Sequence, residues 1–110
     1  MNSWMEEIAE LCREYFSEHG VTSSGLDGWH RVANSINVEL HHGFSKRSRG
    51  CLFDDIVIAH APDQANLHKV CAHELTEALL RTETAIPPFQ IPNNMMDPHH
   101  MIALNMETYS

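Results

Sequence analysis

Basic residues are scarce in this chain. Seven Lys and Arg stand against 15 Asp and Glu, so the 110 residues carry a formal net charge of −8. Most of these cations lie in or beside one short stretch: Arg31, Lys46, Arg47 and Arg49. A general nucleic-acid binder needs a basic face that neutralises many phosphates. We therefore predict no direct binding to nucleic acid.

Long apolar runs, a basic leader and a cysteine framework are also missing. No run is apolar over the roughly 20 residues that a membrane helix needs, and the opening MNSWMEEIAE is acidic where a signal peptide is basic. The three cysteines, Cys12, Cys51 and Cys71, are odd in number and far apart, so no disulfide framework follows. These absences predict a cytoplasmic protein with reduced thiols. We expect Cys71 to be a small buried apolar residue.

The composition is otherwise that of a globular protein. Hydrophobic residues make up 43% of the chain, which is ordinary for a folded domain. The length suits one modest core, and no internal repeat is visible. We therefore predict a single domain over residues 1–110.

Hydrophobic spacing predicts four helices and about three strands. Ser3 and Glu6 form a capping box before an amphipathic helix, and Asp63 and Asp97 are expected to cap two later ones. The predicted helices cover residues 3–19, 27–35, 63–81 and 99–108, with a proline-containing loop over 82–96. The predicted strands are INVELHH at 36–42, CLF at 51–53 and the run DDIVIAH at 54–60. The expected fold is a small α+β domain with an antiparallel sheet.

The segment CAHELTEALL, residues 71–80, carries the strongest chemical signal. It begins like the H-E-x-x-H motif of zinc peptidases, but Glu77 stands where the second histidine belongs. On a helix His73 and Glu77 point only about 40° apart, so both can reach one metal ion. Glu74 is rotated away from them, as is the general base of a metallopeptidase. The same pattern also arises by chance in acidic helices, where these side chains are merely solvated.

A third ligand is needed from another part of the chain. The last predicted helix begins with His99 and His100, so an imidazole from this helix can complete the set. Two imidazoles and one carboxylate leave a coordination position for water, as catalytic zinc requires. We predict a zinc site in which the carboxylate and one imidazole have exchanged helices.

At these residues the chain resembles the ImmA/IrrE-type zinc metallopeptidases. The resemblance runs from about Leu26 to Glu107 and rests on VANSINVEL, RGCLFDDIVIAHAPD and VCAHELTEALLR. The third-ligand helix of that family has a Glu followed three residues later by Ala. His100 and Ala103 fit this spacing, which favours His100 over His99. Glu77 and His100 depart from the residues that the family has at those positions.

The resemblance implies a zincin-like endopeptidase that acts on a regulatory protein, such as a helix-turn-helix repressor. His73, Glu77 and His100 would hold zinc, and Glu74 would take the proton of the attacking water. Two alternatives remain: a degenerate relative that binds a protein partner without cutting it, and a metal-binding domain with another role. His41, His42, His60 and His68 are further candidates for the site that the sequence does not rank.

Overall fold

The computed structural model describes residues 3–82 and 98–109. These residues form four helices and a three-stranded sheet: α1 (Ser3–Glu18), α2 (Asp27–Ser35), β1 (Glu39–Phe44), β2 (Arg49–Phe53), β3 (Ile56–Ala61), α3 (Gln64–Leu80) and α4 (Pro98–Met106). The predicted α+β class is confirmed. The predicted cap Asp97 and almost all of the predicted loop 82–96 lie outside the described residues.

The sheet is mixed, so the predicted antiparallel sheet is wrong. The strand order is β1-β3-β2, with β3 parallel to β1 and antiparallel to β2. After β2 the chain turns back, and β3 lies between β1 and β2 instead of at an edge of the sheet. The physical reason is burial, because Val57, Ala59 and Ala61 of β3 are fully buried. The most apolar strand takes the centre and leaves the more polar β1 and β2 at the edges.

Two residues with positive φ set the strand boundaries. Asn37 has φ 58° and ends the turn that follows α2, so β1 begins at Glu39 and not at the predicted Ile36. Asp54 also has φ 58° and, with Asp55, links β2 to β3. Asn and Asp tolerate this left-handed conformation better than other residues with a Cβ.

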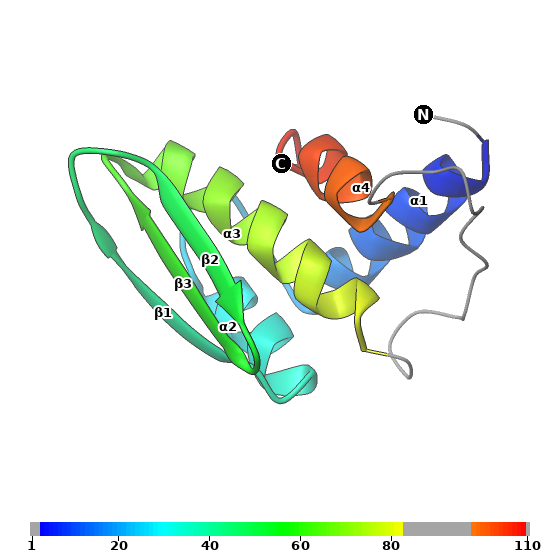
Figure 1. Cartoon of the computed structure of the whole chain (residues 1–110), viewed down its shortest axis with the longest axis horizontal. Coiled ribbons are helices and arrows are strands. Elements are labelled where there is room, and N and C mark those ends of the chain that lie inside the picture. The colour runs from blue at the N-terminus through cyan, green and yellow to red at the C-terminus, as the bar shows by residue number, and fades with distance from the viewer. Residues whose placement is uncertain (1–2, 83–97, 110) are drawn as a thin grey trace.

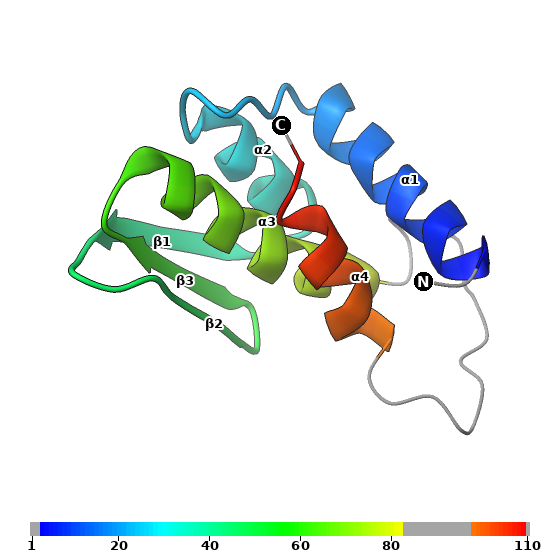
Figure 2. The same ribbon diagram turned by 90° about the horizontal axis from the view of Figure 1, so that it is seen from above.

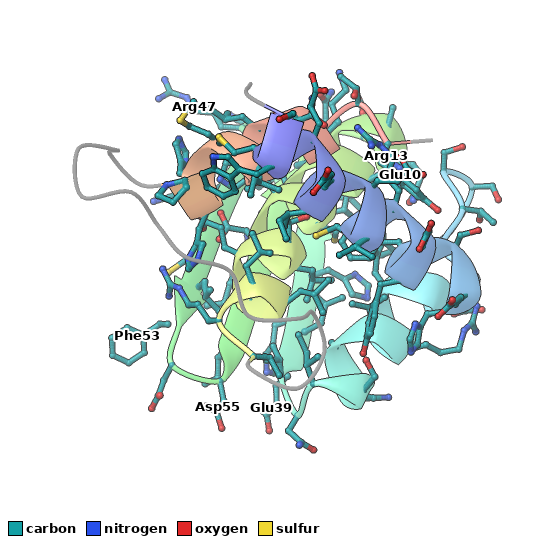
Figure 3. All side chains as sticks on the ribbon, turned by 90° about the vertical axis from the view of Figure 1, so that its right-hand side faces the viewer. Glu10, Arg13, Glu39, Arg47, Phe53 and Asp55 are labelled. Carbon is teal, nitrogen blue, oxygen red and sulfur yellow. The ribbon has the colours of Figure 1, made fainter. Side chains whose placement is uncertain are left out.

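The helices lie on one side of the sheet (Figure 1). Helix α3 lies on the sheet in about the same direction as the strands and separates the sheet from α1 and α4, while α2 packs beside α3 and β1 (Figure 2). The tip of the β2–β3 hairpin, with Phe53 and Asp55, projects at one end of the sheet, and Arg47 lies at the other (Figure 3). Helix α3 therefore has neighbours on both sides and is the central element of the fold.

The position of α3 follows from its sequence. The Asp63 carboxylate accepts a hydrogen bond from the backbone N–H of Asn66 at 2.8 Å, which confirms the predicted cap. Apolar residues then cover most of the helix surface, and the buried ones include Leu67, Cys71, Ala72, Leu75, Ala78, Leu79 and Leu80. A helix that is apolar on most sides belongs inside the domain.

All three cysteines are free thiols. Cys12 and Cys71 are buried as small core residues, and burial raises the pKa of each thiol to about 12. Such thiols are chemically inert at neutral pH. In the described residues no helix is long and apolar enough to cross a membrane.

The contact between α2 and the segment that follows α1 leaves no room for a side chain at Gly28. A Cβ at this position would lie 2.4 Å from the Cα of Val21, which is backbone and cannot rotate away. We predict that Gly28→Ala lowers the free energy of unfolding by about 1–3 kcal/mol despite the higher helix propensity of alanine. Gly25→Ala is the matched control because nothing lies within 4 Å of its Cβ. Urea denaturation of both variants measures the difference, and equal midpoints would contradict this packing.

Candidate metal centre

His73 and Glu77 lie one helical turn apart on α3. Their side chains are 16% and 14% exposed, and the His73 Nε2 lies 3.9 Å from the Glu77 Oε1. The two groups thus face the same side of the helix, as their spacing predicted. Both side chains are therefore mostly buried.

The third candidate arrives on α4, which packs antiparallel to α3 (Figure 1). His100 at the beginning of α4 meets Glu77 near the end of α3, with its Nδ1 3.4 Å from the Glu77 Oε1. Its ring centroid lies 5.0 Å from that of His73. Among the described residues, one ligand atom from each of His73, Glu77 and His100 lies within 4.8 Å of the other two.

The spacing of these atoms can be compared with that of the ligands of a small tetrahedral ion. Zinc bonds of about 2.0–2.2 Å place neighbouring ligand atoms roughly 3.3–3.5 Å apart. The His100–Glu77 distance of 3.4 Å is in this range, and the His73–Glu77 distance of 3.9 Å is slightly longer. His100 is 48% exposed, so the cluster opens to solvent on the α4 side. The donor set is the type that binds zinc and leaves one position open.

Glu107 is a part of the site that the sequence did not reveal. Its Oε2 lies 2.8 Å from the His73 Nδ1. An ionised carboxylate only accepts hydrogen bonds, so Nδ1 carries the proton and the lone pair of Nε2 is directed to the Glu77 side. Metal-binding histidines commonly have such a carboxylate behind them. One sequence signal existed: Glu107 follows His100 by two helical turns and therefore shares its face.

Glu74 lies beside the cluster but outside it. The residue is only 9% exposed and packs against β2, where a Cβ on Gly50 would come within 2.6 Å of the Glu74 Oε1. Burial raises the pKa of Glu74, the charge of Glu77 raises it further, and His73, Arg81 and His100 act against the shift. The position is that of a carboxylate near the candidate ligands, as the sequence predicted.

The remaining histidines divide into groups with other surroundings. His41 and His42 lie on β1, the sheet edge away from β2, and His42 contacts the ring of His30. His68 is a core residue: its Nδ1 accepts from the Trp29 indole at 3.1 Å, and its Nε2 lies 2.7 Å from the Tyr109 carbonyl. His60 lines a shallow cavity with Cys51 and Ile58 on the other face of the sheet. His99 is partly buried and is not in the three-residue cluster.

Comparison with protein-family models, with curated proteins and with solved structures found no match to this chain.

The contact of Glu107 with His73 makes a prediction about metal affinity. Removing a carboxylate that orients a ligand histidine typically weakens metal binding about 10–100-fold. We predict this loss for Glu107→Gln, because the amide keeps the shape of the side chain but not its charge. Zinc affinity is measured by competition with a chromophoric chelator. Glu14→Gln on the exposed face of α1 removes the same charge as a control and leaves the affinity unchanged. Equal affinities of the two variants would show that Glu107 does not support a ligand.

Proposed function

We propose that this chain is a zinc-dependent peptidase that acts on a regulatory protein by water attack. The observation that carries the proposal is the convergence of His73, Glu77 and His100 from two helices onto one point. These residues form a catalytic type of donor set, with a further carboxylate held beside it. The sequence resemblance to ImmA/IrrE-type metallopeptidases supports a peptide substrate and a zincin-like fold.

Different residues of the chain have different roles in the proposed hydrolysis. His73 Nε2, Glu77 and an imidazole nitrogen of His100 would hold the metal, and Glu107 fixes the ring of His73 through Nδ1. Bound zinc acts as a Lewis acid that polarises a carbonyl and lowers the pKa of water. Glu74 accepts the proton of the attacking water and returns it to the leaving amine. Gly50 lets the Glu74 carboxylate lie against β2, because no Cβ occupies that space.

The exchange of ligands keeps the charge of the proposed centre. Two neutral imidazoles and one carboxylate bring a divalent ion to a net charge of about +1 in either arrangement. With Glu77 on α3 and His100 on α4, the proposed ligand set therefore keeps the same total charge, although the motif on α3 is altered. This unchanged charge supports a rearranged site over a broken one, and it supports zinc among the metals that such ligands bind.

The protein partner follows from the resemblance. Relatives of that family act on helix-turn-helix repressors, so a repressor is the first substrate to test. A chain that binds zinc but cleaves nothing would instead be a partner-binding relative.

The test separates the metal from the chemistry. We predict that Glu74→Gln keeps one zinc per chain but lowers peptide cleavage by about 100-fold or more, because glutamine cannot accept the proton. His73→Ala is expected to lose the metal while remaining folded. Metal content is measured by elemental analysis, and cleavage by mass spectrometry of a proteome-derived peptide library. A folded His73→Ala protein with unchanged zinc would disprove the ligand assignment, and full cleavage by Glu74→Gln would disprove the base.

A second prediction concerns the space beside Glu74. In Gly50→Ala the new Cβ would lie 2.6 Å from the Glu74 Oε1, 2.8 Å from its Cγ and 2.9 Å from the Val70 Cγ1. The Glu74 carboxylate must therefore move, together with the Val70 methyl group, whereas none of the three candidate ligands is contacted. We expect zinc affinity within about twofold of the parent and cleavage reduced by at least tenfold, as for a displaced general base. Gly43→Ala is the control, because its Cβ would meet only His60 at ordinary distances of 3.5 Å and 3.6 Å. Parallel loss in both glycine variants would assign the effect to the sheet and not to Glu74.

A further inference from the structure

Two histidines meet where α2 packs beside β1, at the edge of the sheet opposite to β2 (Figure 2). The ring centroids of His30 on α2 and His42 on β1 are 5.0 Å apart, with an angle of 66° between the ring planes. His42 follows the buried Leu40 by two residues, so it is on the same side of the strand, the side that the helices cover. The pair therefore connects a helix to an edge strand, away from Glu74 and the candidate metal centre.

The ring nitrogens of this pair are not used by the protein. Among the described residues, no hydrogen bond or ion pair holds a ring nitrogen of His30 or His42. His68 is the opposite case, because both its ring nitrogens have partners. A neutral imidazole has one nitrogen with a free lone pair. Each ring of the pair can therefore offer a lone pair to a ligand.

The charges around the pair favour a cation. Burial lowers the pKa of His30, the neighbouring His42 lowers it further, and Asp27 acts against the shift. His30 is therefore neutral at pH 7, as a metal ligand has to be. Asp27 lies one turn before it on α2 and supplies a negative charge. Arg31, the next residue along the helix, donates hydrogen bonds to two backbone carbonyls just after α1 and is held there.

The separation of the two rings is close to that of two imidazoles on one ion. Zinc–nitrogen bonds of about 2.0–2.1 Å at a tetrahedral angle put the two ring centroids roughly 5.2 Å apart. The centroids of His30 and His42 are 5.0 Å apart, the same distance as between His73 and His100 in the candidate metal centre. His42 is exposed, so its ring can turn and direct a nitrogen at an ion without disturbing the core.

We infer that His30 and His42 form a second metal site, which binds a divalent transition-metal ion such as zinc. Imidazole ligands favour zinc, copper and nickel over magnesium and calcium. Only two protein ligands hold the ion and water completes its coordination, so this site is weaker than the three-residue centre. Dialysis removes its ion, and the purified chain keeps one zinc. The bound ion stabilises the contact between α2 and β1. The second site does not depend on the proposed peptidase function.

Zinc titration by isothermal calorimetry, with the thiols kept reduced, tests the site. We expect two binding events in the parent, of which the tighter belongs to the candidate metal centre and is lost in His73→Ala. His42→Gln is expected to weaken the other event about tenfold or more, since even the loss of a residue behind a ligand costs that much. His41→Gln is the matched control, because His41 is also exposed but points to the opposite face of the strand. This control should retain both events.

A double variant tests whether the two rings share one ion. If they do, His30→Gln alone weakens the second event as much as His30→Gln with His42→Gln, because either change removes the chelate. Circular dichroism confirms that each protein is folded. In the His73→Ala background, zinc at about ten times its dissociation constant should raise the midpoint of thermal unfolding by about 4–8 °C. The further change His42→Gln should abolish this increase.

Several results would overturn the second site. They are the absence of any zinc binding in a folded His73→Ala protein, equal losses in His41→Gln and His42→Gln, and independent losses that add in the double variant. The two metal sites are tested separately. If His73→Ala changes nothing and His42→Gln removes the zinc, the second site stands and the candidate metal centre fails.

The reverse pattern, in which His73→Ala removes all zinc binding and His42→Gln removes none, keeps the candidate metal centre and disproves the second site.

Discussion

The antiparallel packing of α4 on α3 is the interaction on which the candidate site depends. The two helices are in contact, and both contribute fully buried apolar side chains to the core, such as Leu79 of α3 and Ile102 and Met106 of α4. Burial of such side chains contributes about 1.5–3 kcal/mol each, which is more than any exposed ion pair supplies. Three polar contacts then follow the helices in reverse order: His68 with Tyr109, His73 with Glu107, and Glu77 with His100. A change in the relative position of the two helices would separate all three pairs together.

The same contact explains which parts of the molecule were predictable. The helices, the Asp63 cap and the shared direction of His73 and Glu77 follow from spacing along one segment, which the sequence records directly. The proximity of His100 to Glu77 was also predicted, because both residues lie in segments with helical signals. Glu107 was missed because its contact with His73 depends on how two helices cross. Residue types and spacing within one segment do not encode that crossing.

The sheet gives a second example of this limit. The alternation in each strand indicates which residues face the core, but it does not say which strands are neighbours. Three strands in sequence favoured a simple antiparallel arrangement, whereas β3 inserts between β1 and β2. The burial of Val57, Ala59 and Ala61 decides the order, since the centre of a sheet is its most protected place. The left-handed backbone of Asn37 likewise moved the start of β1, and no periodicity marks a single residue of this kind.

His68 and His73 both lie on α3, but their surroundings give them different roles. His68 is 4% exposed, and both its ring nitrogens are occupied by Trp29 and Tyr109, so it is a packing residue. His73 has only one nitrogen occupied, by Glu107, and the other faces Glu77. The two residues therefore differ in how many of their ring nitrogens have a hydrogen-bond partner. A ring nitrogen without a hydrogen-bond partner is available to bind a ligand.

The absence of a side chain at Gly50 also has a consequence for how the β2–β3 hairpin folds. In the observed pairing Gly50 lies opposite Ala59 on the side of α3, with Glu74 in the space above it. A slip of one residue would turn Arg49 or Cys51 toward that carboxylate and turn Leu52 away from the core. Either side chain would collide with Glu74 or hold the hairpin off the helix. The strand alignment and the position of the Glu74 carboxylate therefore depend on each other, because only the observed pairing puts a residue without a side chain beside that carboxylate.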